Sequence, residues 1–517
     1  MSLSIIETAL RANGRSQSVK AWVQQEDKRA EKIARFRRYA DGDHDNHLTT
    51  EQRRLLNIRS TSNDDSTDFN DNICGIILDT MLDRINLLGV KADNETASEW
   101  IRKLLERERI DALQIEAAEA TLRDGNSYLM VHPDIETGVA HFSHEPAYDG
   151  SFGTLVMYES TAAREPMLAV KVWKVTSTNI ADTTRMNVYY PDRIERFVSQ
   201  ETIDGASTSL AQYTGDGQRA VIPWMMRDGT PIGVPFVHFK NRGSSADSYG
   251  LSELENVMPL QNAENVVLTS IVSTALLSGF PIRALIGAKA PADVVPGRIE
   301  SFFPQNADGS PASTVDEGVL KWLQAIRLEQ FEVSDLSKLL EVAAWLKSEM
   351  YTVTNTPTDD IAADASGEAR KQSEVKLIGK VKRFCVKNGN AWEDAVRLAA
   401  RVETAYAQGG TAKPPTFETV TAQWADAEVR NDSQFVDDML KQYREGVIDQ
   451  RTYLDSVKDI FGWDAAKIDK IIKETEKARN QQAQQEIDSA NAITTAKAEA
   501  TAMLNEANGS NGANQAA

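Results

Sequence analysis

Cysteine is scarce in this sequence of 517 residues. Its two cysteines, Cys74 and Cys385, are too few for a disulfide framework and form no CxxC zinc motif. The first residues, MSLSIIETALRANGRSQ, lack the basic start and long apolar run of a signal peptide. These absences argue against a secreted disulfide scaffold and predict a protein of a reducing compartment such as a cytoplasm.

Positive charge is in short supply as well. The chain holds 57 Lys and Arg against 76 Asp and Glu, a formal net charge of −19. A protein that wraps nucleic acid with its whole surface needs a basic footprint, which this balance argues against. The balance remains compatible with a protein past which DNA slides without being held. The basic group RFRR at 35–38 is expected to be a solvated helix face.

Apolar runs are too short for a membrane span. The uncharged stretch VVLTSIVSTALLSGFPI covers only residues 266–282 and contains several Ser and Thr. A bilayer span needs about 20 predominantly apolar residues. We expect a long helix buried against other protein, and no membrane contact.

Motifs of common enzymes are missing. The sequence contains no GxxxxGK loop followed by Ser or Thr, and no GxSxG, HExxH or GxGxxG motif. His141, His144 and Glu145 form one group able to bind a metal, although ordinary surface or turn histidines are expected there. We predict no catalytic residue, no metal and no cofactor.

The stretch DGDHDNHLTTEQ at 41–52 raises the question of a calcium site. Asp41, Asp43 and Asp45 occupy the first ligand positions of a calcium loop. Asn46 stands where that loop needs glycine, and Gln52 where it needs a bidentate glutamate. We favour a polar turn after a helix. A metal-dependent hydrolase that uses the three aspartates stays open as an alternative.

Hydrophobic periodicity predicts helices over 17–40, 70–90 and 96–125. Between 128 and 240, short runs rich in β-branched and aromatic residues predict strands. A helix is expected over 367–407, a strand over 417–426, more helices after 432, and disorder for the final NGSNGANQAA. This mixture predicts an α+β fold.

Two long helices are predicted to bracket an insert at 281–333. The first begins at Ser252, with Glu255 completing a capping box, kinks at Pro259 and ends at Ser278. At 1.5 Å per residue it spans roughly 40 Å, more than one small core covers, so it must pack against something outside its own domain. The second begins at Ser334. The apolar residues expected to pack these helices are Leu254, Val257, Leu260, Val267, Ile271, Leu336, Leu339, Leu340 and Leu346.

A polar loop, NTPTDDIAADASGEAR, follows at 355–370. Ser366 is expected to cap the next helix, which starts at Gly367. Glu368 suits the positive end of the helix dipole.

Four stretches resemble the portal, or head-to-tail connector, family of tailed double-stranded DNA phages, in particular its siphophage type. They are RYADGDHD after the first helix, EATLRDGNSYLMVHPD, PFVHFKNRGSSADSYGLSELENVMPLQNAEN and NTPTDDIAADASGEARK. Together they span residues from about 30 to 430. The third matches best, with these residues in the family's order: Pro235, Phe239, Asn241, Gly250, Ser252, Glu253, Leu260, Gln261, Ala263 and Asn265.

The resemblance implies a division of the chain into parts. They are a wing (1–248 and 367–430), two stem helices (249–279 and 334–353), a clip (280–333), a tunnel loop (354–366) and a crown with a disordered tail (431–517). Copies of the chain are expected to pack side by side in a dodecameric ring. The tunnel-loop residues expected to face DNA are Asn355, Thr356, Pro357, Thr358, Asp359 and Asp360.

The resemblance also implies a structural role in the virion. The ring would form the channel at one capsid vertex through which terminase packages double-stranded DNA and from which DNA is ejected into the tail. Terminase, major capsid and scaffolding proteins and a head-tail adaptor are the implied partners, with assembly in the host cytoplasm. Another virion adaptor or minor head protein stays open as an alternative. An acidic channel suits this role, because each fixed phosphate contact adds affinity for DNA.

Overall fold

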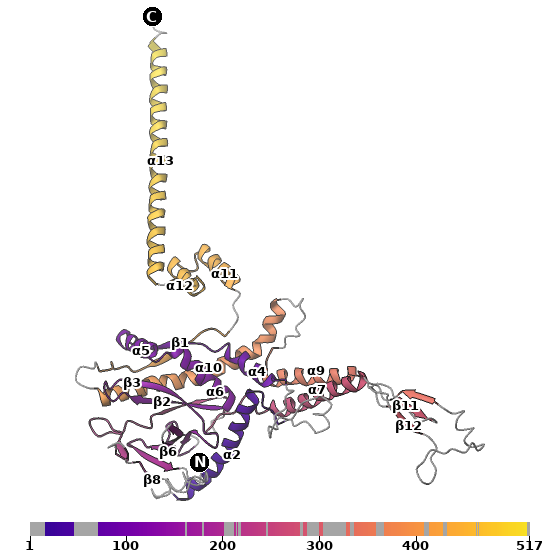
Figure 1. Ribbon diagram of the computed structural model, residues 1–517. Coiled ribbons are helices and arrows are strands. Elements are labelled where there is room, and N and C mark those ends of the chain that lie inside the picture. Colours follow the sequence, from indigo (N-terminus) through magenta and orange to yellow (C-terminus); the bar gives the residue numbers. More distant parts are fainter. Residues whose placement is uncertain are drawn as a thin grey trace, which may run out of the picture. The chain divides into compact units, whose positions relative to one another are not determined.

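The computed structural model describes residues 16–45, 71–160, 163–177, 180–200, 211–213, 215, 219–243, 247–279, 283–286, 299–302, 327–330, 336–357, 367–407, 413–427, 432–461, 463 and 465–513. The chain separates into two compact units, Met1–Ala427 and Glu428–Ala517. The first unit combines helices with antiparallel sheets, and the second is helical in its described part (Figure 1). The predicted α+β class is confirmed.

Helices begin the first unit: α2 (Ser16–Ala40), α4 (Ile73–Leu82), α5 (Glu95–Arg107) and α6 (Ile110–Asp124). The first agrees with the predicted helix over 17–40. The helix predicted over 96–125 was wrong as one element, because Arg109 takes a left-handed conformation (φ 50°) and separates α5 from α6. The helix predicted over 70–90 ends at Leu82, and strand β1 (Leu87–Ala92) follows.

Antiparallel strands fill the predicted β-rich stretch. One sheet has the order β10-β2-β3, and a larger one has the order β4-β5-β6-β7-β8 with β9 also paired to β7. In β5 the side chains alternate, with Val170 and Val172 buried and Lys171 and Trp173 less so, as a strand with one covered face requires. The strands are β2 (Asn126–Pro133), β3 (Ala140–Pro146), β4 (Gly153–Met157), β5 (Leu168–Ser177), β6 (Ile180–Tyr189), β7 (Arg193–Gln200), β8 (Ala211–Gln212), β9 (Val221–Pro223) and β10 (Phe236–Lys240).

The two long helices are α7 (Met258–Gly279) and α9 (Leu336–Thr354), and they pack against each other (Figure 1). The predicted start of the first helix at Ser252 was wrong. The Ser252 hydroxyl donates to Arg123 O and accepts from Leu254 N, so it caps a turn rather than a helix. Pro259 is the second residue of α7, where a missing N–H costs nothing and no kink arises.

A small sheet lies in the segment between these helices. Its strands are β11 (Arg283–Ile286), β12 (Ile299–Phe302) and β13 (Arg327–Gln330). The central β11 pairs in parallel with β12 and antiparallel with β13. This arrangement gives the predicted insert a β-structure of its own.

The longest helix of the first unit, α10 (Gly367–Tyr406), matches the predicted helix over 367–407. Strand β14 (Val420–Trp424) follows inside the predicted strand and pairs antiparallel with β1, more than 300 residues earlier in the sequence. None of the helices in the described part of the chain is both long and apolar enough to cross a bilayer.

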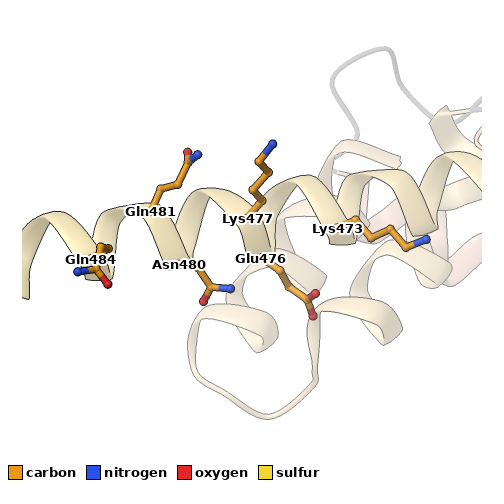
Figure 2. Close-up of a pocket in the computed structure, with 6 residues that line it drawn as sticks. All are labelled: Lys473, Glu476, Lys477, Asn480, Gln481 and Gln484. Carbon is orange, nitrogen blue, oxygen red and sulfur yellow. The ribbon is translucent and has the colours of Figure 1, made fainter.

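The second unit contains α11 (Asp432–Arg444), α12 (Gln450–Phe461) and α13 (Ala465–Ala513). The disorder predicted for NGSNGANQAA was wrong as far as Ala513, because α13 continues to that residue. A hollow along α13 is lined by Lys473, Glu476, Lys477, Asn480, Gln481 and Gln484. Figure 2 shows these side chains leaving a single helix in different directions, so they do not converge on a common point.

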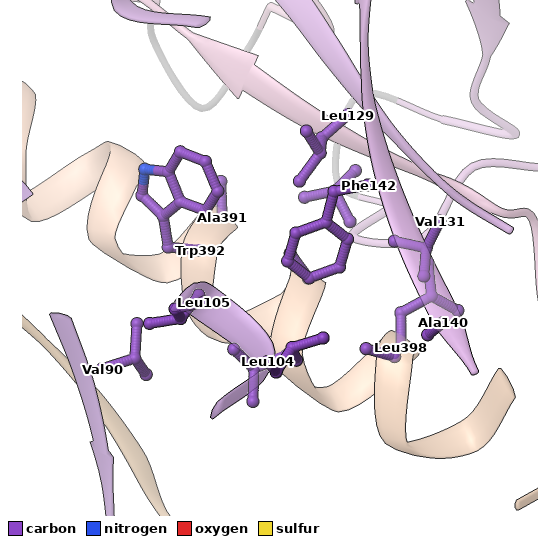
Figure 3. Close-up of a cluster of buried hydrophobic side chains, with 14 of the residues drawn as sticks. Val90, Leu104, Leu105, Leu129, Val131, Ala140, Phe142, Ala391, Trp392 and Leu398 are labelled. Atoms are coloured by element: carbon purple, nitrogen blue, oxygen red, sulfur yellow. The ribbon is translucent and has the colours of Figure 1, made fainter. Parts of the chain in front are cut away.

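The main core of the first unit joins the β10-β2-β3 sheet to α5, α10 and β14. Trp392 of α10 is its largest fully buried side chain and meets Phe239 edge-on, with ring centroids 5.0 Å apart. Loss of such an aromatic ring costs about 3–5 kcal/mol of stability. Figure 3 shows Trp392, Leu104, Leu105, Phe142 and Leu129 pointing into this shared interior.

A second core, which we call the junction cluster, gathers apolar side chains of α2, α4, α6, α9 and α10 and of the turns before α7. Its buried members include Phe36, Tyr39, Ile73, Ile77, Leu78, Met81, Leu122, Leu254, Val257, Met350, Tyr351, Leu377, Val381 and Phe384. This cluster lies where the paired helices join the rest of the first unit.

Candidate functional site at the root of the paired helices

Buried amides of α7 hold the start of α4. Gln261 and Asn265 are four residues apart, share one helix face and are fully buried. Gln261 Oε1 accepts hydrogen bonds from Ile73 N (3.0 Å) and Cys74 N (3.3 Å). These are N–H groups of the first turn of α4, which lack partners within their own helix. Gln261 Nε2 donates to Asp71 O at 2.7 Å, so a single side chain ties α7 to α4.

His44 connects this amide pair to the end of α2. Asn265 Nδ2 lies 2.8 Å from His44 Nδ1, and His44 Nε2 lies 3.2 Å from Tyr39 O. Because Asn265 Oδ1 accepts from Asp71 N (3.3 Å), its Nδ2 is the donor, and His44 Nδ1 is the acceptor. The remaining ring proton is then on Nε2, which donates to Tyr39 O. Burial lowers the pKa of His44 from its ordinary value.

Two of the three aspartates of DGDHD are paired with arginines of α2. Asp45 lies 2.6 Å from both Arg35 and Arg38, and Asp43 lies 3.6 Å from Arg38. Burial alone would raise the pKa of Asp45, but the hydrogen bond to Arg38 and the charge of Arg35 outweigh it, so the pKa is lowered. Within the described residues, no three His, Cys, Asp or Glu side chains come together as a metal site. Residues 41–45 form a polar turn in which Asp43 and Asp45 already have cationic partners, whereas residues 46–52 of the suspected calcium loop lie outside the described residues.

The RFRR group is only partly solvated, contrary to the expectation. Arg37 donates to Asp124 (2.9 Å), to Asp149 (2.8 Å) and to Ala147 O (2.7 Å). Asp124 is buried at the end of α6. Arg37 therefore fixes α2 to α6 and to the loop after β3.

Glu264, one turn along from Gln261, is a buried carboxyl group. Gln261 Nε2 donates to its Oε2 at 3.1 Å. The pKa of Glu264 is raised to about 7, mainly by burial and also by the nearby charge of Asp71, while Lys347 of α9 opposes the shift. The root of the paired helices thus contains a group that titrates near neutral pH.

A second buried network holds the end of α9. Lys380 of α10 makes an ion pair with Glu253 (2.5 Å) and donates to Thr354 O (2.9 Å). Burial lowers the pKa of Lys380, while Glu253 acts in the opposite direction. Asn241 Nδ2 donates to the other oxygen of Glu253 at 2.8 Å. The cation at Thr354 O also suits the negative end of the α9 dipole.

A known family matches most of the chain. The family model described as "Phage portal protein, SPP1 Gp6-like" matches residues 21–481. The chain belongs to this portal family. Both core clusters, both buried networks and the paired helices fall within the matched range.

Curated relatives agree with this membership. The portal protein of Mycobacterium phage L5 is 26% identical over 285 residues, covering 51% of this chain and 55% of the relative. The portal protein of Mycobacterium phage D29 is 28% identical over 241 residues, covering 44% and 46%. The chain thus spans about half the length of the curated relatives it matches.

Two solved structures with similarity to this chain come from particle necks. "Neck of empty GTA particle computed with C6 symmetry" has a TM-score of 0.36 and 14% identity, covering 72% of this chain and 84% of that one. "Neck of native GTA particle computed with C12 symmetry" has a TM-score of 0.36 and 15% identity, covering 74% and 87%.

The loop residues that the portal resemblance assigned to DNA lie partly inside the chain. Thr356 was expected to face a channel, but it is buried, and its hydroxyl shares a hydrogen bond with that of Thr354 (2.8 Å). Asn355 takes a left-handed conformation (φ 57°) that ends α9, and Pro357 is half-buried. Four of the named residues, Thr358, Asp359, Asp360 and Ser366, lie outside the described residues. Helix α10 begins at Gly367, and the side chain of Glu368 is not described.

The predicted packing residues of the paired helices divide into three groups. Leu254, Val257 and Leu346 are buried in this chain, although the first two lie before α7 rather than on it. Leu340 is 55% exposed in the single chain, so its predicted packing stays a prediction that concerns a neighbouring copy. The half-buried residues are Leu260, Val267, Ile271, Leu336 and Leu339.

Sequence reasoning missed the buried polar groups of the site. Gln261 and Asn265 carried a visible signal, because two amides at helical spacing interrupt an apolar segment. Lys380 carried none, because its partner Glu253 is over 100 residues away. Of the suspected metal group, His141 contacts Glu108 (3.1 Å) and Glu145 binds Lys171 (2.5 Å).

Proposed function

We propose that this chain assembles into a ring, expected to hold twelve copies, that forms the DNA channel at one vertex of a phage capsid. Terminase packages double-stranded DNA through it, and DNA later leaves through it into the tail. Membership of the portal family and the portal names of the curated relatives support this role. The role is structural and needs neither a catalytic residue nor a cofactor.

The observation that carries the ring is apolar surface left exposed on α9. Trp345 is 59% exposed and Val342 42% exposed on one side of this helix. Leu340, at 55%, lies about 140° around the axis from Trp345 at 3.6 residues per turn. A helix inside a ring has a neighbour on each side, and apolar groups on two sides suit such neighbours.

The parts of the chain then take proposed roles. We assign α7 and α9 to the stem (249–279 and 334–353), the β11-β12-β13 sheet to the clip (280–333) and α11 to α13 to the crown (431–517). The wing comprises 1–248 and 367–430, and the tunnel loop 354–366. The clip is the proposed docking point for terminase and the head-tail adaptor, and the wing faces capsid and scaffolding proteins. The ring resides in the virion after assembly in the host cytoplasm.

Native mass tests the ring. Light scattering on a sizing column should give a species near twelve times 57.1 kDa, and negative-stain images should show a central hole. Trp345→Glu should shift the protein to monomers, because it places a charge in an apolar contact. Ser348→Glu puts the same group at an exposed polar position of α9 and should keep the ring. A wild-type chain that stays monomeric at every salt and protein concentration would refute the ring and favour another virion adaptor.

The channel role has its own test in the tunnel loop. Replacing Asp359 and Asp360 with Lys should slow DNA passage, because fixed cations bind phosphate with affinity that depends on salt. Packaging and ejection rates equal to those of the wild type would refute a DNA-facing position for these residues.

A further inference from the structure

The exposed face of α10 is basic and partly apolar. Residues 375–390 contain five Lys and Arg and no Asp or Glu. Lys380 is buried, and the other four cations point outward. Two large apolar side chains, Val375 (61% exposed) and Val386 (70% exposed), stand among them. We call Val375, Lys376, Gly379, Lys382, Arg383 and Val386 the α10 face.

Gly379 lies in the middle of this face, and the packing of its own chain does not require a glycine there. A Cβ at this position would meet only the Arg383 guanidinium, at 3.7 Å, an ordinary contact distance. Glycine inside a helix costs about 1 kcal/mol relative to alanine. A glycine that the chain's own packing does not require, between two exposed valines, suits close approach by another molecule.

A second exposed face has the opposite charge. The helices α4 and α6 contact each other, and Asp79, Asp83, Asp111 and Glu116 project outward from them. Ile76 (44% exposed) and Ile115 (51% exposed) stand among these carboxylates. We call these six residues the acidic face.

Both faces belong to helices that line the junction cluster. The other side of α4 enters this cluster through Ile77 and Met81, and the other side of α10 enters it through Leu377 and Val381. Each helix therefore turns its exposed face away from the same interior. A ring forms when two different surfaces of one copy fit each other head to tail.

We propose that the α10 face of one copy packs against the acidic face of the next copy around the ring. This inference rests on the proposed ring. Opposite charges bring the two faces together in a defined orientation, and the valines of one face meet the isoleucines of the other. Exposed valines and a bare glycine are of no use for holding phosphate, so a second copy suits the α10 face better than DNA does.

Charge reversal tests this pairing with two variants. The first carries Lys376→Glu and Arg383→Glu, and the second carries Asp79→Lys, Asp83→Lys, Asp111→Lys and Glu116→Lys. Each alone has two faces of like charge and should form rings at least tenfold less than the wild type at equal concentration. An equal mixture should restore rings, because the altered α10 face of the first variant meets the oppositely altered acidic face of the second, and the two unaltered faces meet as in the wild type. Native mass spectrometry should then find the two variants alternating, in equal numbers.

Two outcomes overturn the pairing while leaving the ring intact. In one, both variants form rings by themselves with the salt dependence of the wild type. In the other, rings are unaffected but the first variant loses affinity for a short DNA duplex, which would assign the α10 face to DNA. Absence of rings from the wild type is a different result and refutes the proposed function itself. Circular dichroism of each monomeric variant checks that the helices are retained.

Gly379 gives an independent measurement. Gly379→Leu should weaken assembly while retaining a folded monomer, because the monomer has room for the side chain. Gly379→Ala is the matched control, and should raise helix stability while adding only one methyl group to the contact. Rings of Gly379→Leu that withstand dilution as well as wild-type rings would contradict close approach at this face.

Discussion

The buried carboxyl of Glu264 makes the root of the paired helices sensitive to pH. The group has an ordinary pKa of 4.5 and a pKa of about 7 in the folded chain. The folded state therefore holds its proton more tightly than the unfolded state. The contribution of Glu264 to stability is fully present below pH 4.5, falls as the pH rises from 4.5 to 7, and is lost above pH 7. At 1.36 kcal/mol per pKa unit the loss is at most about 3 kcal/mol, or about two orders of magnitude in an opening equilibrium.

Glu264→Gln should remove this penalty, because the amide keeps an oxygen for Gln261 Nε2 and carries no charge. Hydrogen exchange of α4 and α7 measures the effect, with wild type and variant compared at the same pH. Protection should be equal at pH 4.5 and should favour the variant by up to about a hundredfold at pH 8.5. His44, Asp71 and Lys347 are the same in both proteins, so their own effects cancel in the ratio of the variant's protection to that of the wild type.

Glu418→Gln provides the control, because it removes an exposed carboxylate far from α7 in sequence. Its protection ratio should stay near one at every pH. A protection ratio for Glu264→Gln that does not change between pH 4.5 and 8.5 would show that Glu264 is ionised without cost, and would refute the reasoning.

Two further perturbations test the same region. Lys380→Met removes a cation that pairs with the buried carboxylate of Glu253 and should lower the local stability of α9 and α10 by about 3 kcal/mol. Faster hydrogen exchange in these helices would show the effect. Lys103→Met, at an exposed position, should leave exchange unchanged. Gly250→Ala should abolish soluble expression, because its Cβ would lie 2.2 Å from Gly125 O and 2.4 Å from Asn241 O, both backbone atoms. A soluble Gly250→Ala protein with wild-type circular dichroism would contradict this.

Sequence periodicity predicted the elements whose burial pattern is local. The start of α10 at Gly367 and the extent of α2 follow from apolar residues at helical spacing. The start of α7 was predicted wrongly. The capping-box pattern at Ser252 is present in the sequence, but the Ser252 hydroxyl donates to Arg123 O, a partner that no local pattern reveals. Arg109 likewise interrupts a continuous helical pattern without any glycine or proline to mark the break.

The candidate site was predictable in outline only. The resemblance selected Glu253, Gln261 and Asn265 as residues in a family order, and the structure shows all three buried and hydrogen-bonded. Their partners come from α4, α10 and the turn after α2, which are distant in sequence. Thr356 was predicted to face a channel. Its burial could not be foreseen, because it depends on a hydrogen bond to Thr354 and on the packing around Lys380, which is distant in sequence.

The pairing of β1 with β14 has a consequence for synthesis. Leu87 is matched to Trp424, so the sheet is completed only after nearly the whole first unit has been translated. Contacts between residues so far apart form slowly, because a long loop must close first. The paired helices and their insert are made inside that loop, before its ends are joined. A chain stopped short of residue 420 would carry both long helices without the strand that completes this sheet, so β1 would keep an unpaired edge until the rest of the first unit is made.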